Sequence, residues 1–257
     1  MLQVKLIDAI DDSNLVQLGH FRVKVQKSDD AITTASNVIK FDASRDSNVV
    51  VRIVGDGHFV QSDMTTVIPG TELSATTIYL SDGDYELDVD MKYTIRRIEL
   101  GSNLYMGTEQ NGSYTSLEVF KSENSKTKIT LETLATSGSL SNILVNNSGV
   151  SGSLESLKSK RYLVIVNAAG SAIEGDVSSL GDNTSVTTIN VANSAVDGNI
   201  EHLGKLVRLD YLNVQGTSCV GSVDALAQAM KLNGRTSGAL VFGSPDGTWK
   251  QINFPMT

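Results

Sequence analysis

Apolar side chains in the second half of the chain recur with a fixed period of 23 residues. The period is marked by glycines that occupy the same place in each copy, namely Gly152, Gly175, Gly198 and Gly221. Six positions around each glycine hold only small or medium-sized apolar residues: those 12, 9, 7 and 2 residues before it and those 2 and 5 residues after it. This period predicts a solenoid, in which each unit buries its apolar side chains against its neighbours.

The six apolar columns also indicate how each unit folds. The first three follow the pattern Leu-x-x-Leu-x-Val, which predicts a short strand whose side chains alternate between two faces. In the first complete unit the columns hold Leu140, Ile143, Val145, Val150, Leu154 and Leu157. An earlier, degenerate unit places Leu117, Phe120, Leu131 and Leu134 on the columns, with Ile129 at the glycine position. Stacking of such units predicts a parallel sheet with the columns inside.

The columns predict which residues stabilise the fold and are not expected to take part in catalysis or binding. Cys219 falls on the column two residues before Gly221, so we expect a buried small hydrophobe rather than a reactive thiol. Gly175→Val and Leu203→Asp are expected to unfold the array. Glu201 lies outside the columns, so Glu201→Lys is expected to be nearly neutral.

The repeat LxxLxVxx(S/T)xVxGx(I/L/V)xxL resembles the leucine-rich repeat. The resemblance implies a horseshoe-like solenoid that binds ligands on the concave face of its sheet. The family places an asparagine four residues before the glycine, where it bonds the turn. Here that position carries hydroxyl side chains, which can make similar bonds more weakly: Ser148, Ser171, Ser194 and Thr217.

The first half of the chain has no helical period. Short alternating or apolar runs separated by Gly, Asp, Ser and Pro predict a β-sandwich over 36–105. The segment LSDGDYELDVD resembles the late hairpin of Ig-like bacterial domains. Residues 1–35 are expected to form N-terminal strands that serve as an attachment segment. The fold class is therefore mainly β, with this sandwich followed by a leucine-rich-repeat solenoid over 106–231.

The end of the chain is expected to close the solenoid. Residues 224–232 predict a helix that stops at Gly234. The segments GALVFG and TWKQINF, joined by Ser-Pro-Asp-Gly, predict a hairpin within a capping segment over 232–257. Such a cap protects the terminal strand from pairing with other chains.

Charge and cysteine content narrow the function classes. The net charge of −8 argues against electrostatic binding to nucleic acid or to an anionic membrane. One cysteine excludes an intramolecular disulfide. The N-terminus has no basic region followed by an apolar run, so we expect no signal peptide and synthesis in a cytoplasm.

No catalytic or metal-binding pattern emerges. The three histidines, His20, His58 and His202, share no motif spacing. Asp82 and Asp84, with Asp88 and Asp90, form the densest acidic cluster. A calcium loop remains an alternative to a solvated strand face there. We therefore expect a protein that is not an enzyme and has no cofactor, catalytic residue or metal site.

The strands of the solenoid offer a more specific candidate. Residues 10, 8 and 6 positions before each glycine project from the sheet face that the family uses for binding. The candidate binding residues are Asn167, Thr188, Asn190, Tyr211, Asn213 and Gln215. Two interpretations stay open: an asparagine ladder that stabilises the stack, and a docking face for a protein or glycan. A neutral face does not suit a strongly charged ligand.

The modular order adds a further resemblance. A small sandwich followed by leucine-rich repeats is similar to virion structural proteins of tailed phages of Bacteroidales, including crAss-like phages. This resemblance implies a head-fibre, decoration or tail-associated component of a virion, made in the host cytoplasm. Its partners would be other virion proteins, itself as a dimer or trimer, or a host surface protein or glycan. The alternative is a binding module, on the bacterial surface or inside the cell, that recognises a protein or glycan.

Overall fold

A computed structural model of the 257-residue chain describes residues 95–110 and 114–255 and, before them, eight separate strands. Of these, β1 (Gly19–Val25), β2 (Val38–Ala43), β3 (Val49–Val54) and β8 (Tyr85–Met91) are six or seven residues long. The shorter strands are β4 (Phe59–Val60), β5 (Thr66–Val67), β6 (Glu72–Leu73) and β7 (Thr77–Leu80).

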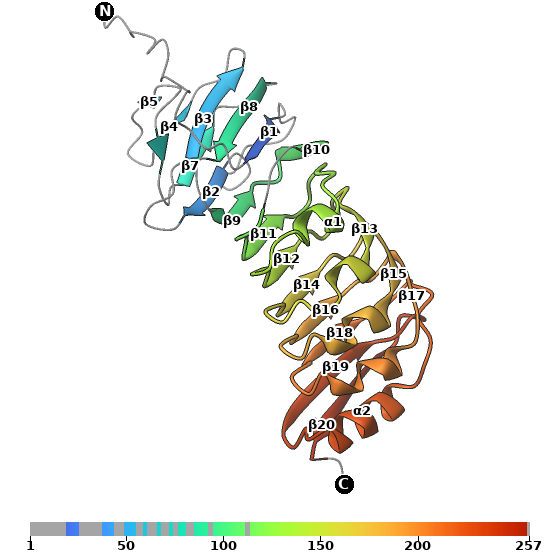
Figure 1. The fold of residues 1–257 in the computed structure, drawn as a ribbon. Helices are drawn as coiled ribbons and strands as arrows, with labels where there is room; N and C mark the ends of the chain where they lie inside the picture. Colours follow the sequence, from blue (N-terminus) through green and yellow to red (C-terminus); the bar gives the residue numbers. More distant parts are fainter. Residues whose placement is uncertain are drawn as a thin grey trace, which may run out of the picture.

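The 23-residue repeat folds into a solenoid in which each unit adds one short parallel strand to the main sheet (Figure 1). These strands are β12 (Asn142–Leu144), β14 (Ile165–Asn167), β16 (Thr188–Asn190) and β18 (Tyr211–Asn213). Their register follows the period, since Ile143 lies opposite Val166, Val166 opposite Ile189 and Ile189 opposite Leu212. The parallel stack is consistent with the leucine-rich-repeat solenoid that the sequence resembles.

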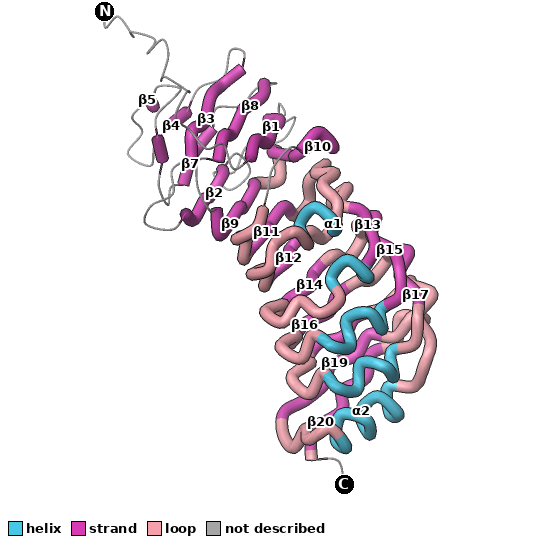
Figure 2. Tube along the Cα trace, in the orientation of Figure 1, coloured by secondary structure: helices cyan, strands magenta, loops and turns pink. Residues whose placement is uncertain are grey.

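The return half of each unit forms a second wall (Figure 2). It contains the small parallel sheet of β13 (Ser151–Ser153), β15 (Ala172–Asp176) and β17 (Ala195–Asp197). Short helices follow: α1 (Leu131–Leu134), then the 3-10 helices η2 (Leu154–Leu157), η3 (Val177–Asp182) and η4 (Ile200–Lys205). Along the solenoid these helices lie on one face of the main sheet, and no described helix covers the other, outer face (Figure 2).

Every residue of the six apolar columns in the four complete units is buried between these walls. Leu203 is fully buried, and Cys219 is 5% exposed, as the column assignment predicted. Burial of each Leu, Ile or Val contributes about 1.5–3 kcal/mol, so the columns supply the main stabilising energy of the array.

Hydroxyl side chains close the turn after each strand. Ser148, Ser171, Ser194 and Thr217 each donate to the backbone carbonyl three residues earlier, over 2.5–2.7 Å. The backbone N–H groups of Val150 and Cys219 donate to the hydroxyl oxygens of Ser148 and Thr217. The hydroxyls therefore make the turn bonds that the sequence predicted for them.

The degenerate first unit is present and has a polar interior. β11 (Val119–Ser122) pairs with β12 and keeps the register of the later strands. Two inward columns hold Ser122 and Thr127, both fully buried, and their hydroxyls are 2.6 Å apart in a hydrogen bond. The backbone N–H of Met106 also donates to Thr127 Oγ1. The interior polar atoms of this unit are thus partnered, which makes their burial tolerable.

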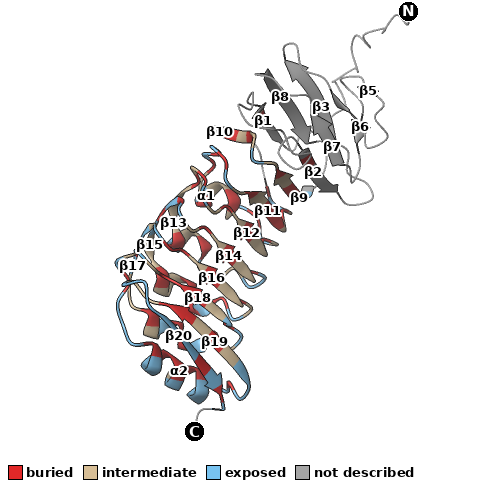
Figure 3. Ribbon diagram, turned by 180° about the vertical axis from the view of Figure 1, so that it is seen from behind, coloured by how far each residue is buried: buried red, intermediate tan, exposed pale blue. Residues whose placement is uncertain are grey.

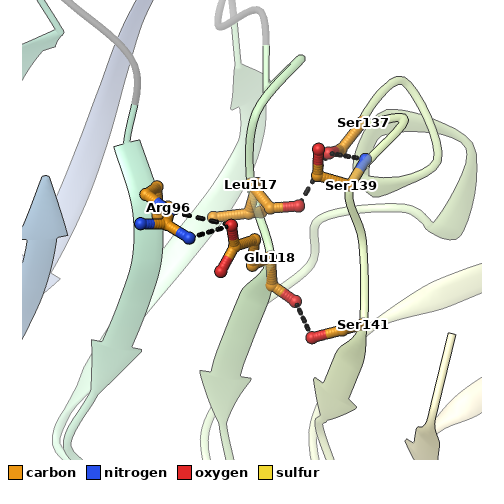
Figure 4. A network of polar contacts seen from close by, with 6 residues as sticks. All are labelled: Arg96, Leu117, Glu118, Ser137, Ser139 and Ser141. Atoms are coloured by element: carbon orange, nitrogen blue, oxygen red, sulfur yellow. Dashed lines mark hydrogen bonds and ion pairs between the residues drawn. The ribbon is translucent and has the colours of Figure 1, made fainter. Parts of the chain in front are cut away.

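The main sheet runs without a break from the solenoid into the N-terminal part of the chain. β9 (Ile95–Leu100) is parallel to β11 on one side and antiparallel to β2 on the other. Side chains tie this junction, since Arg96 donates to Glu118 Oε1 and Ser141 Oγ donates to the carbonyl of Glu118 (Figure 4). The sheet ends with β7, β4 and β5.

A second, five-stranded sheet has the order β10-β1-β8-β3-β6, with β10 spanning Leu104–Gln110. β1 lies between β10 and β8, which joins part of the segment predicted over 1–35 to this sheet. The Ig-like assignment and the domain boundaries stay predictions. Residues 1–18, including the first expected strand, lie outside the described residues.

The C-terminal cap contains the predicted helix and hairpin. α2 (Val223–Leu232) begins after Ser222, whose hydroxyl accepts from the backbone N–H of Ala225, and ends before Gly234. β19 (Gly238–Gly243) adds to the main sheet in parallel with β18, and β20 (Trp249–Phe254) adds antiparallel to β19. The hairpin therefore extends the sheet by two strands, and β20 is its last strand.

Candidate functional site

The outer face of the main sheet, here called the sheet face, is the candidate site. Each solenoid strand buries its central residue and leaves the two flanking residues partly exposed, with the fuller burial of Asn213 as the exception. Figure 3 shows this alternation along the stack. From β12 to β20 the outward residues are Asn142, Leu144, Ile165, Asn167, Thr188, Asn190, Tyr211, Asn213, Ala239, Val241, Gly243, Trp249, Gln251 and Asn253.

Charge is confined to one end of the sheet face. At the N-terminal end, Arg97 pairs with Glu99 over 2.5 Å on β9, and Lys121 of β11 pairs with Glu123 over 3.3 Å. The outward residues from β12 to β20 carry no ionisable side chain except the phenol of Tyr211. This part of the face therefore suits an uncharged ligand surface, as the sequence predicted.

Two of the predicted binding residues belong to an asparagine ladder. Asn167 donates its amide to Asn146 Oδ1 over 3.2 Å, and Asn190 donates to Asn167 Oδ1 over 3.0 Å. The ladder ends there, because Asn190 Oδ1 is buried without a hydrogen-bond partner. The interpretation as an asparagine ladder that stabilises the stack therefore applies to Asn167 and Asn190. Their part in binding stays a prediction.

Three other predicted residues meet at the C-terminal end of the face. Asn213 is 7% exposed; its amide lies 3.5 Å from the Tyr211 hydroxyl, and its Oδ1 accepts from the backbone N–H of Gln215. The Gln215 side chain donates to the carbonyl of Gly247 in the hairpin turn over 3.0 Å. Thr188 is half-buried on β16, in register with Tyr211 of β18.

The repeat pattern missed Trp249, which completes this group. Its ring centroid lies 5.9 Å from that of Tyr211, with the ring planes tilted by 41°. Gly243 separates the two strands at this point, and a Cβ on it would lie 3.0 Å from Trp249 Cη2. Trp249 lies on the hairpin, outside the 23-residue period, so only the pairing of β20 with β19 could have placed it.

The repeat glycines have a structural explanation that the sequence did not supply. The carboxylates of Glu132 and Glu155 occupy the space beside Gly152 and Gly175, where side chains would otherwise stand. Each carboxylate also accepts from a backbone N–H of the next unit, at Ser153 over 2.8 Å and at Asp176 over 3.0 Å. The glycines therefore admit a bond between successive units.

This arrangement corrects the expectation for Glu201. Its Oε1 accepts from the backbone N–H of Ser222 over 2.8 Å, at the start of α2. A lysine at position 201 would remove that acceptor and place a positive charge at a helix N-terminus, where it is unfavourable. We therefore expect Glu201→Lys to destabilise the array, contrary to the expectation from the sequence.

The structure describes only some of the remaining chemical candidates. His202 is exposed on η4. Burial of the Cys219 side chain raises the pKa of its thiol. Asp82 and Asp84 lie outside the described residues, so the calcium alternative stays untested. Within the described part of the chain, no group of His, Cys, Asp and Glu is arranged to hold a metal ion. No described helix has the length and apolarity to cross a bilayer.

Comparison with known proteins adds likenesses to two solved repeat proteins. No protein-family profile and no curated protein matches the chain. An internalin (InlF) structure from Listeria monocytogenes aligns with 41% of this chain and 30% of its own, at 20% identity and a TM-score of 0.36. The Arabidopsis receptor kinase HAESA, solved with the peptide hormone IDA and the co-receptor SERK1, aligns with 42% of this chain and 19% of its own, at 19% identity and a TM-score of 0.35. Likenesses at this level carry no functional argument, and the solenoid is established by the chain's own strand register and buried columns.

Proposed function

We propose that the chain is a non-enzymatic binding protein that docks a macromolecular partner on its sheet face. The observation that carries the proposal is the uncovered outer side of the main sheet, where strands from β12 to β20 present uncharged, partly exposed side chains in regular rows. Loops and helices fill the other side. A row of side chains fixed on a rigid scaffold suits recognition of an extended surface.

The sheet face can be tested by placing a charge at its centre. Thr188→Glu introduces a carboxylate on β16, whereas Gln228→Glu introduces one on the exposed side of α2 as a matched control. Both variants and the parent chain are immobilised, and the retained proteins and glycans are identified by mass spectrometry. We expect a partner that the parent and Gln228→Glu retain and Thr188→Glu loses. Equal retention by all three would contradict docking on this face.

The narrower assignment, to a head-fibre, decoration or tail-associated protein of a tailed-phage virion, is a proposal that rests on the sequence resemblance. Neither the fold nor the comparisons add support to it. A dimer or trimer is part of that proposal. Mass spectrometry of purified virions and sedimentation of the isolated chain test it directly. The alternative location on a bacterial surface is favoured if the gene encodes a lipoprotein leader upstream of Met1.

A further inference from the structure

The C-terminal end of the sheet face carries an aromatic pair that the core does not need. The Trp249 side chain is 53% exposed, although a tryptophan is costly to leave in water. Tyr211 lies on β18, on the other side of β19 from Trp249, and the two ring centroids are 5.9 Å apart. β20 is largely exposed in Figure 3. We call Tyr211, Trp249, Asn213, Gln215 and Gln251 the aromatic corner.

Neighbouring residues hold the two rings in place. Gly243 lies between them in the sheet, opposite Asn213 on one side and Trp249 on the other. A Cβ on Gly243 would lie 2.5 Å from Asn213 Oδ1 and 3.0 Å from Trp249 Cη2, so glycine is what lets the amide and the indole approach the same point. The indole thus rests on the sheet and keeps an exposed surface.

The polar groups around the rings are amides without charge. The side chains of Gln215 and Gln251 each donate one N–H within the fold, to the Gly247 carbonyl and to Asn253 Oδ1, and keep a second N–H and a carbonyl oxygen for a sugar hydroxyl. Asn213 is 7% exposed and already bonds Tyr211 and Gln215, so it supports the corner and offers no free group to a ligand. The nearby charges on β20 and its turn are engaged elsewhere. Lys250 bonds Asp224 of α2, and the Asp246 carboxylate accepts from the Thr248 backbone and hydroxyl. The corner therefore combines apolar ring surface with neutral hydrogen-bonding groups.

We propose that the aromatic corner is a binding subsite for a neutral saccharide chain, with one sugar ring packed by its C–H face on the indole of Trp249. The inference rests on the proposed function, because it assigns a ligand class to one end of the sheet face. A saccharide fits better than a protein hot spot here, since amides and one half-buried valine, Val241, border the rings, and these do not form the apolar rim that excludes water from a protein anchor. The uncharged border also disfavours sulfated or acidic glycans.

Trp249 is the only tryptophan of the chain, so its fluorescence reports this corner directly. The full chain is titrated with neutral hexasaccharides of mannose, glucose, galactose, xylose and N-acetylglucosamine, and with a sulfated heparin hexasaccharide. We expect a saturable change in emission with at least one neutral sugar. The affinity should stay the same up to about 0.5 M NaCl, since no charge pairs form.

Three variants assign the binding to the corner. Tyr211→Ala keeps the fluorescent reporter and is expected to weaken binding about tenfold or more, as loss of a central aromatic anchor does. Trp249→Ala, followed by calorimetry, is expected to abolish binding. Tyr162→Ala removes an exposed tyrosine from the turn before β14, outside the aromatic corner, and should leave binding unchanged. Thermal unfolding of each variant separates loss of binding from loss of fold.

Several outcomes would overturn the inference. They are no response to any neutral hexasaccharide, binding of heparin alone with strong salt dependence, binding that survives in both aromatic variants, or a protein partner that depends on Trp249. The proposed function is judged separately by Thr188→Glu. If that variant loses a partner while no saccharide binds the parent, the sheet face stands as a docking surface and the saccharide subsite falls.

Discussion

The carboxylate of Glu155 occupies the space beside Gly175 that a side chain on Gly175 would need. Gly175 also has a φ of +93°, a region that residues with a Cβ rarely adopt. The same carboxylate accepts from the backbone N–H of Asp176 over 3.0 Å. One glycine thus meets a local backbone requirement and a packing requirement, and the packing requirement links one unit of the solenoid to the next.

Gly175→Ala should destabilise the array for two separable reasons. Backbone strain at positive φ costs about 1–3 kcal/mol, and displacement of Glu155 adds the loss of its bond to Asp176. Gly247→Ala is the matched control, because Gly247 has a φ of +89° but nothing within 4 Å of the added Cβ. Urea unfolding of both variants measures the difference. Equal losses of unfolding free energy would mean that the displaced carboxylate contributes nothing.

The Glu201 bond to the start of α2 should also be measurable. Glu201→Ala leaves the backbone N–H of Ser222 without its carboxylate acceptor and is expected to cost about 0.5–1.5 kcal/mol of unfolding free energy. Glu174→Ala removes an exposed glutamate from β15 and should stay within about 0.5 kcal/mol of the parent. If Glu201→Ala is as stable as the Glu174→Ala control, the Glu201 bond to Ser222 does not contribute to the free energy of unfolding.

The sequence predicted the buried columns because a strict period fixes which residues face inward in every unit. It also placed α2 and the hairpin, whose caps and turn residues are local signals. The sequence could not predict the contacts between units, because the glutamate bonds and the Tyr211–Trp249 pair depend on how neighbouring strands and turns lie in space. The sequence also contains a local signal for the start of each short helix. The residue after each repeat glycine is an N-cap of the following helix, namely Ser153, Asp176, Asn199 and Ser222.

Of the predicted site, the neutral character of the sheet face could be inferred from composition alone. Whether a given asparagine bonds its neighbour or a ligand could not, since the spacing of Asn167, Asn190 and Asn213 is the same. The structure separates them: the first two bond along the ladder, whereas Asn213 turns toward Tyr211 and Gln215. Asn213 differs from the other two because the residue opposite it on β19 is Gly243, so no further asparagine side chain is there to continue the ladder.

Asp246 should titrate well below an ordinary aspartate. Hydrogen bonds from the Ser244 hydroxyl, then from the Thr248 backbone and hydroxyl, lower its pKa from 3.8 to about 2. Because the folded-state pKa is depressed, its contribution to the hairpin turn is complete above about pH 3.8 and is lost as the pH falls through about 2. NMR titration of the carboxyl carbon measures this pKa, and Asp246→Ala should remove the transition. A measured value near 3.8 would contradict these bonds.

Arg235 is expected to be the most sensitive residue of the C-terminal cap. Its side chain is 2% exposed and donates to the carbonyls of Leu209 and Ala239 and to Asp210, and its guanidinium lies 4.5 Å from the centre of the Phe254 ring. Arg235→Ala leaves both carbonyls without this donor. Each buried acceptor left unpaired costs about 1–3 kcal/mol, so we expect a loss of at least about 2 kcal/mol.

Arg235→Lys keeps the positive charge but lacks the planar guanidinium with its several N–H donors, so it should recover only part of the unfolding free energy that Arg235→Ala loses. Arg208→Ala serves as the control, because Arg208 is exposed in the turn before β18 and adjoins Leu209, and it should change the unfolding free energy by less than about 0.5 kcal/mol. Hydrogen exchange at β19 and β20 locates the effect, because the arginine joins the last solenoid turn to the hairpin. If the hairpin amides of Arg235→Ala stay as protected as those of the Arg208 control, the cap does not depend on this arginine.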